Sequence, residues 1–223
     1  MFPLRDDRPT YTAPIVTTLL IIACALVFIF ELLLDDYSRN HFITMYGVVP
    51  ARLHLQTLLT SMFLHGGWSH IIGNMLFLWA FGKSLEDAMG HTKFLGFYLA
   101  CGVISALVHV GFNFYSYAPT VGASGAIAGV MGAYLLKFPR ANIKTLVFVL
   151  VFVTTADLPA AFVLVYWFLI QLSSGYGAIA HTTVTDSGVA WFAHIGGFIA
   201  GMVLVKMMGT RDRYYRRRDI YWN

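Results

Sequence analysis

A serine and a histidine in separate apolar stretches have residue types and surroundings suited to nucleophilic catalysis. Ser124 lies in a Gly-Ala-Ser-Gly motif at residues 122–125, and His194 lies in an Ala-His-Ile-Gly-Gly motif at residues 193–197. A serine becomes a nucleophile when a neighbouring base takes its proton, and histidine is the side chain that most often does so. The two motifs therefore indicate a serine hydrolase, if the segments that carry them touch.

A second pair of polar residues could stabilise the charge that such a reaction develops. His70 and Asn74 are four residues apart, so they share one face of a helix. Both can donate hydrogen bonds, as an oxyanion requires. Structural interpretations remain open for each residue: Ser124 as a helix N-cap, His194 as a hydrogen bond between helices, and the His70–Asn74 pair as a polar contact that joins helices.

The composition places these residues in a membrane. The chain has 223 residues, of which 58% are hydrophobic and only 12% charged, and its mean hydropathy is +0.67. A soluble domain carries about 25% charged residues. The net charge of +4 does not indicate nucleic-acid binding, because the basic residues cluster between apolar segments and in the tail rather than on one face. Ionisable groups within membrane spans are rare and usually functional.

Apolar runs predict an all-α membrane protein, a polytopic bundle of six transmembrane helices with lipids as its surroundings. The expected spans are about 15–34, 69–89, 94–113, 122–138, 157–173 and 188–208. The short apolar stretch from Thr145 to Val153 is expected to be interfacial, or to lead into the fifth span with Pro159 in its first turn. A seventh full span in this region is the main alternative.

The distribution of basic residues predicts the orientation of the bundle. With six spans, thirteen Lys and Arg residues fall on the side of the termini, and only Arg39 and Arg52 fall on the other. The positive-inside rule therefore places both termini in the cytoplasm. We divide the chain into a cytoplasmic segment at 1–14, a membrane domain at 15–208 and a basic cytoplasmic tail at 209–223. The tail is typical of a stop-transfer anchor, and contact with anionic lipid is the sharper alternative.

Small residues give the two catalytic segments a reason to touch. Gly125 and Gly129 lie four apart on the fourth span, and Gly197 and Gly201 lie four apart on the sixth. Such spacing lets helix backbones approach closely in lipid. His194 is three residues before Gly197, so it lies on the packing stripe. Gly122 and Gly125 also let the backbone turn sharply beside Ser124.

Two other kinds of site are less well supported. His65, His70 and His194 could bind zinc, but the chain has no HExxH motif and no carboxylate close in sequence to His65 or His70. A transporter would fit polar residues within spans, but no inverted repeat is visible. The serine chemistry requires neither a metal nor a cofactor.

Three segments together resemble the rhomboid intramembrane serine proteases. They are the stretch from Thr60 to Met75, which contains His65, His70 and Asn74, the motif around Ser124, and the motif around His194. The six-span layout with a long first loop is also similar, and the resemblance covers nearly the whole chain from the first span to the last.

The resemblance implies a role for each matched residue. It implies Ser124 as nucleophile, His194 as general base, and an oxyanion site made by His70, Asn74 and the backbone N–H of Ser124. Gly122 matches the family's glycine two residues before the serine. His65 matches a histidine that orders the first loop.

The chain departs from the family pattern at two places. Ala128 stands where members often carry Tyr or Phe against the catalytic histidine, so another side chain must orient His194. Gln56 and Thr57 stand where many members have Trp-Arg.

The resulting hypothesis is an intramembrane endopeptidase that cleaves transmembrane-helix substrates near the extracytoplasmic side by a Ser–His dyad. The loop at 174–188, which includes His181, is a candidate cap, and the fifth helix, with Trp167 and Phe168, is a candidate side gate. The alternative is a catalytically inactive relative that binds transmembrane helices. A prokaryotic plasma membrane is the expected location.

Overall fold

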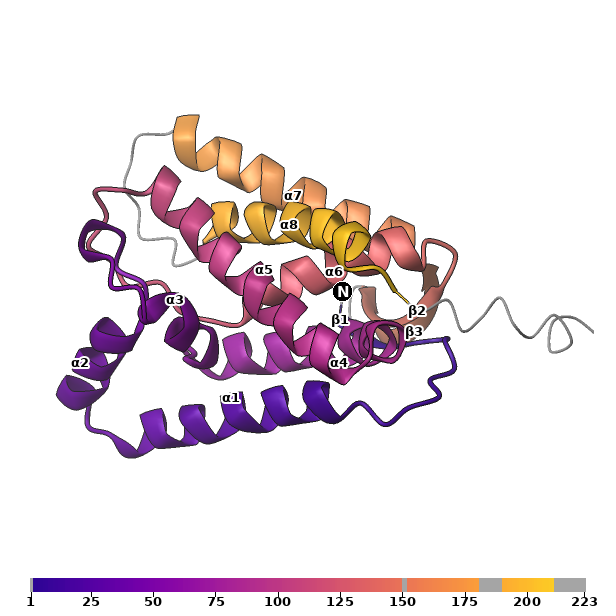
Figure 1. Cartoon of the computed structure of the whole chain (residues 1–223), viewed down its shortest axis with the longest axis horizontal. Helices are drawn as coiled ribbons and strands as arrows, with labels where there is room; N and C mark the ends of the chain where they lie inside the picture. Colours follow the sequence, from indigo (N-terminus) through magenta and orange to yellow (C-terminus); the bar gives the residue numbers. More distant parts are fainter. Residues whose placement is uncertain (1, 150–151, 181–189, 211–223) are drawn as a thin grey trace, which may run out of the picture.

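The computed structural model describes residues 2–149, 152–180 and 190–210, and these form a bundle of helices with a small sheet at one end (Figure 1). The bundle has α4 and α1 on one side, α7 and α8 on the other, and α5 and α6 between them (Figure 1). The helices are α1 (Ile15–Leu33), α2 (Asp36–Tyr46), α3 (Thr57–Thr60), α4 (Trp68–Met89), α5 (His91–Phe112), α6 (Ser124–Lys137), α7 (Ala160–Ala180) and α8 (Trp191–Met208), with short 3₁₀ turns η1 (Pro50–Arg52) and η2 (Ser61–Phe63).

Three described helices, α1, α5 and α8, are both long and apolar enough to cross a membrane. In α4 the last two turns carry Lys83, Glu86 and Asp87, which lowers its mean hydropathy. The central helix α6 has only 14 residues, or about 21 Å at 1.5 Å per residue. The bundle thus agrees with a helical membrane protein, and the count of six spans stays a prediction.

The expectation of an all-α fold is wrong for one region. The described residues 142–149 and 152–159 are not helical, so they form neither a helical lead-in nor a seventh transmembrane helix, whereas the interfacial position of this stretch stays a prediction. They fold as β2 (Asn142–Val149) and β3 (Phe152–Pro159), an antiparallel pair. The N-terminal β1 (Phe2–Asp6) adds to β2, which gives the order β1-β2-β3. β-branched and aromatic residues fill β2, and these favour strands once a partner strand is present.

The sheet also moves the start of the next helix. Pro159 is the last residue of β3, not part of the first helical turn, and α7 begins at Ala160. The helix then continues to Ala180 rather than ending at 173. Ser174–Ala180 of the predicted cap is therefore helical, and the remainder of that cap, with His181, lies outside the described residues. Most of the tail at 209–223 lies outside them as well.

Glycine allows α6 and α8 to pack with their backbones in contact. Every residue of α6 from Gly125 to Tyr134 is buried. A Cβ built on Gly201 would overlap the backbone of Gly129, and one built on Gly197 would overlap the carbonyl of Gly125. The predicted stripes on these two helices therefore face each other.

The segment between α1 and α4 carries two helices, α2 and the short α3. Asp35 caps α2 by accepting from the Ser38 backbone N–H at 3.0 Å and from the Ser38 hydroxyl at 2.7 Å. The backbone hydrogen bond, and after it the hydroxyl, lowers the pKa of the Asp35 carboxyl because both favour its charged form.

Two carboxylates at the end of α4 hold the start of α1. Glu86 is fully buried and accepts from the backbone N–H groups of Val16 and Thr17, both at 2.8 Å, and from the Thr17 hydroxyl at 2.7 Å. Asp87 accepts from Tyr11 and Thr12 in the segment just before α1. Since the first N–H groups of a helix have no partner within it, these acids replace a local cap and fix α1 against α4.

Replacing Glu86 with alanine is expected to lower the free energy of unfolding by about 3 kcal/mol, because it leaves two backbone N–H groups of α1 buried without acceptors. Denaturant titration of the purified protein in detergent would measure the change. Asp36→Ala, which removes an exposed acid, serves as the matched control and should unfold close to wild type. An unfolding transition of Glu86→Ala at the same denaturant concentration as wild type would contradict the capping role.

Candidate active site

Ser124 is the first residue of α6, at the point where the chain turns sharply into the bundle. Gly122 makes this turn with a φ of +125°, a conformation that favours glycine. Its backbone N–H donates to the carbonyl of Ser61 at 2.9 Å. A Cβ at Gly122 would lie 2.7 Å from the imidazole of His70, so glycine allows α4 to bring His70 against the turn.

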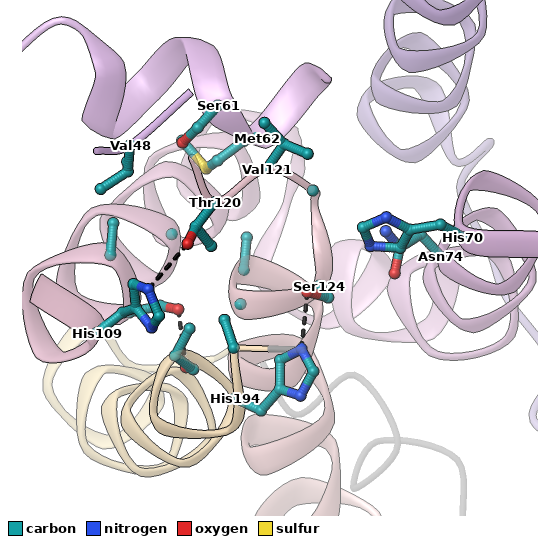
Figure 2. Close-up of a pocket in the computed structure, with 18 of the residues that line it drawn as sticks. Val48, Ser61, Met62, His70, Asn74, His109, Thr120, Val121, Ser124 and His194 are labelled. Carbon is teal, nitrogen blue, oxygen red and sulfur yellow. Dashed lines mark hydrogen bonds between the residues drawn. The ribbon is translucent and has the colours of Figure 1, made fainter. Parts of the chain in front are cut away.

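His194 meets Ser124 from the first turn of α8. Its Nε2 lies 2.8 Å from the Ser124 Oγ (Figure 2). The α6–α8 contact positions the pair, and a further contact supports it, because the Ser105 hydroxyl of α5 donates to the carbonyl of Ala193 at 2.7 Å. The two residues that the sequence separates by 70 positions are thus within hydrogen-bond reach, which is the arrangement that a nucleophile and its base require.

His70 and Asn74 both lie on the side of α4 that faces Ser124 (Figure 2). Asn74 is buried, and its Nδ2 has no hydrogen-bond partner among the described residues. It lies close to the Gly122 turn, 3.6 Å from a Cβ built there. An unused donor beside a serine at a helix N-terminus is suited to donating a hydrogen bond to a negatively charged oxygen.

These four side chains line a single cavity of about 490 Å³. Polar groups from other elements extend it beyond Ser124, among them Ser61, Ser105 and His109. His109 lies 2.8 Å from the Thr120 hydroxyl through its Nε2 (Figure 2), so it joins α5 to the loop that precedes α6. The cavity is large enough for a short stretch of extended peptide, and it combines apolar walls with a few convergent polar groups.

His65 does not line this cavity. It is fully buried beside α1, where its backbone N–H donates to Glu31 at 3.3 Å, and its ring lies edge-on to His70 with centroids 5.3 Å apart. His65 thus lies between α1 and the His70 ring, in the segment that leads into α4. The supporting role expected for His65 stays a prediction.

Two residues of α7 contact His194, a role that the sequence predicted for neither, since Trp167 was expected only as part of the side gate. Gln171 is buried, and its Oε1 lies 2.7 Å from His194 Nδ1. The Trp167 ring lies against the imidazole with centroids 5.7 Å apart. Ala128 on α6 offers only a methyl group, so α7 supplies the orienting contacts that the sequence left unassigned. A glutamine within the apolar stretch of α7 that precedes the two serines at 173–174 was the available signal.

The same contacts bear on the predicted side gate. Phe168 of α7 stacks on Phe198 of α8 with centroids 4.5 Å apart, and Trp167 and Gln171 hold His194. A movement of the whole of α7 would therefore also release the base. The gate remains a prediction, now with this constraint.

The family match and the relatives identify what this chain resembles. The family described as "Rhomboid domain" matches residues 52–211. The chain is 30% identical over 210 residues to "Rhomboid protease GluP" of Bacillus subtilis, which covers 92% of this chain and 36% of that protein. It is 32% identical over 156 residues to "Presenilin-associated rhomboid-like protein, mitochondrial" of Bos taurus. This match covers 69% of this chain and 39% of that protein.

A third relative is "Rhomboid protein 1, mitochondrial" of Saccharomyces cerevisiae, 33% identical over 96 residues, which is 41% of this chain and 28% of that protein. The matched regions span well under half of the relatives' own lengths. The relatives come from a bacterium and from mitochondria, so they do not favour the prokaryotic plasma membrane over an organelle.

Proposed function

The chain belongs to the rhomboid family, and on that premise we propose that it is a membrane-embedded serine endopeptidase that cleaves transmembrane helices by a Ser124–His194 dyad. The observation that carries this proposal is the 2.8 Å contact between His194 Nε2 and Ser124 Oγ, made at the N-terminus of α6 inside a cavity into which several polar groups converge. A seryl hydroxyl there has a base within reach and donors nearby.

The reaction follows from the positions of these groups. His194 takes the proton of Ser124 as Oγ attacks the scissile carbonyl. The oxyanion that forms accepts hydrogen bonds from His70, Asn74 and the Ser124 backbone N–H. His194 then protonates the leaving amine, and water hydrolyses the acyl-enzyme by the same steps in reverse order.

The substrate class follows from backbone chemistry. A helix within a membrane satisfies its amides internally, so a peptide bond becomes accessible to Ser124 only where the substrate helix unwinds. We therefore propose substrates whose transmembrane helix carries small or helix-weakening residues near its extracytoplasmic end. The topology that accompanies this proposal has six spans within 15–208 and both termini in the cytoplasm. A prokaryotic plasma membrane remains the predicted location.

A fluorophosphonate probe tests the proposal without knowledge of the natural substrate. Purified wild type in detergent is expected to label, and Ser124→Ala, with an unchanged melting profile, is expected not to label. A reporter transmembrane substrate assayed in parallel should be cut by wild type alone. Wild type that neither labels nor cuts, yet binds the reporter, would replace the proposal with the helix-binding alternative.

Substituting alanine for Asn74 is expected to lower kcat by roughly 10²- to 10³-fold with little change in KM, because a donor used only by the oxyanion is lost. Cleavage of the reporter over a range of substrate concentrations would separate the two constants. Gly73→Ala is the matched control, since a Cβ at this neighbouring position meets nothing within 4 Å. Equal losses in the two variants would argue that Asn74 only packs α4.

A further inference from the structure

We propose that Gln171 selects the tautomer of His194 that acts as a base, so that the working unit is a Gln171–His194–Ser124 relay in which Gln171 is a positioning residue. This inference rests on the proposed function. Its starting observation is that His194 has a partner on each ring nitrogen: Gln171 Oε1 at 2.7 Å from Nδ1, and Ser124 Oγ at 2.8 Å from Nε2.

The amide oxygen determines where the imidazole proton lies. A neutral imidazole carries one N–H and one acceptor nitrogen. An amide oxygen can only accept, so Nδ1 must hold the proton that Gln171 receives. The lone pair of Nε2 then faces the Ser124 hydroxyl, as proton abstraction requires. In the opposite tautomer Nε2 would present an N–H to Ser124 and could not take its proton.

The orientation of the Gln171 amide is itself fixed by its helix. The Nε2 of Gln171 donates to the carbonyl of Trp167, one turn earlier, at 3.4 Å. Flipping the amide would turn Oε1 toward this carbonyl oxygen, which has no proton to share. Since the side chain is only 5% exposed, water offers little alternative. The flipped amide is therefore disfavoured, and Oε1 stays directed at His194.

Ring packing from α7 and α8 also restrains the orientation of the imidazole. Trp167 of α7 lies against it with centroids 5.7 Å apart at 41°, and Trp191, at the start of α8, meets it edge-on at 6.4 Å. Ala128, on the opposite helix, is fully buried and contributes no ring. Gln171 and Trp167 therefore position His194 from one turn of α7.

Gln171 also stabilises the positive charge that His194 acquires during the reaction. The titratable groups that act on it from the packed helices are His70 on α4 and His109 on α5, and neither can offset a positive charge. During proton transfer His194 becomes an imidazolium, whose Nδ1–H is more strongly polarised. The Gln171 oxygen accepts from it, and hydrogen bonds to a charged group are stronger than neutral ones.

The test measures the rate of fluorophosphonate labelling between pH 5 and pH 9 for the full chain in detergent. Gln171→Leu removes the acceptor at similar size, and Gln171→Glu places a carboxylate beside Nδ1. Leu172→Ala is the matched control, because this neighbouring side chain is 41% exposed on the outer face of α7. Ser124→Ala gives the background.

Gln171→Leu is expected to label about 10- to 100-fold more slowly at every pH, as loss of one buried hydrogen bond predicts, while Leu172→Ala labels within about twofold of wild type. In Gln171→Glu the acid limb of the profile should move to higher pH, because the carboxylate favours the protonated imidazole. A purely structural role for Gln171 would not move this limb.

The outcomes separate the inference from the proposed function. If Gln171→Leu labels at the wild-type rate while Ser124→Ala does not label, the relay is overturned and the protease proposal stands. If wild type neither labels nor cuts the reporter, both are overturned. If Gln171→Leu fails to fold, Gln171→Glu decides the question, and an acid limb at the wild-type pH overturns the relay.

Discussion

Replacing His194 with alanine is expected to reduce cleavage of a reporter transmembrane substrate by roughly 10⁴-fold or more. The reason is that, among the residues that the structure describes, His194 is the base in hydrogen-bond contact with the nucleophile: its Nε2 lies 2.8 Å from Ser124 Oγ, and serine is a weak nucleophile at its own pKa. The loss should fall on kcat, since His194 acts in the transition state rather than in binding. Initial cleavage rates in detergent or proteoliposomes measure it.

A double variant tests whether Ser124 and His194 act as a unit. Removing either member of a dyad should cost nearly all of the rate, so Ser124→Ala combined with His194→Ala is expected to be no slower than Ser124→Ala alone. His41→Ala is the matched control, because this histidine is exposed on α2. A His194→Ala enzyme that keeps more than about a tenth of the wild-type rate would contradict the assignment of the base.

The helices of the bundle could be predicted because their signals are local. Apolar runs predicted 69–89 and 122–138, and the structure has Trp68–Met89 and Ser124–Lys137. Gly90, with a φ of +81°, ends α4 and precedes α5. A glycine directly after an apolar helical run is a local signal for a helix end. Small-residue spacing likewise predicted that the helices carrying Gly129 and Gly201 would touch, because this pattern permits close approach of helices in lipid.

What the sequence did not predict depends on contacts between distant residues. The sheet requires β1 to pair with β2 across more than 130 residues of chain, with Phe2 opposite Leu146, and no local pattern specifies that pairing. Gln171 is visible as a polar residue in an apolar helix, but its role depends on where α7 lies against α8. The partner of Glu86 is similarly a helix start about 70 residues earlier.

Gly201→Leu is expected to destabilise the protein by about 3 kcal/mol or more and to abolish fluorophosphonate labelling. A Cβ at Gly201 would overlap the backbone of Gly129 on α6. Backbone atoms cannot move aside as a flexible side chain can, so α6 and α8 must separate, and overpacking of a tight contact is costly. The same two helices carry Ser124 and His194, about two turns away along α8, so separation also breaks the dyad.

The matched control is Gly96→Ala on the exposed side of α5, where a Cβ meets nothing within 4 Å. Its free energy of unfolding should stay within about 1 kcal/mol of wild type, since alanine favours a helix slightly over glycine. Denaturant titration in detergent compares the two variants, and labelling of the folded fraction reports on the site. If Gly201→Leu unfolds like Gly96→Ala and still labels, α6 and α8 do not depend on direct backbone contact, and the dyad must be positioned by α7 and α5 instead.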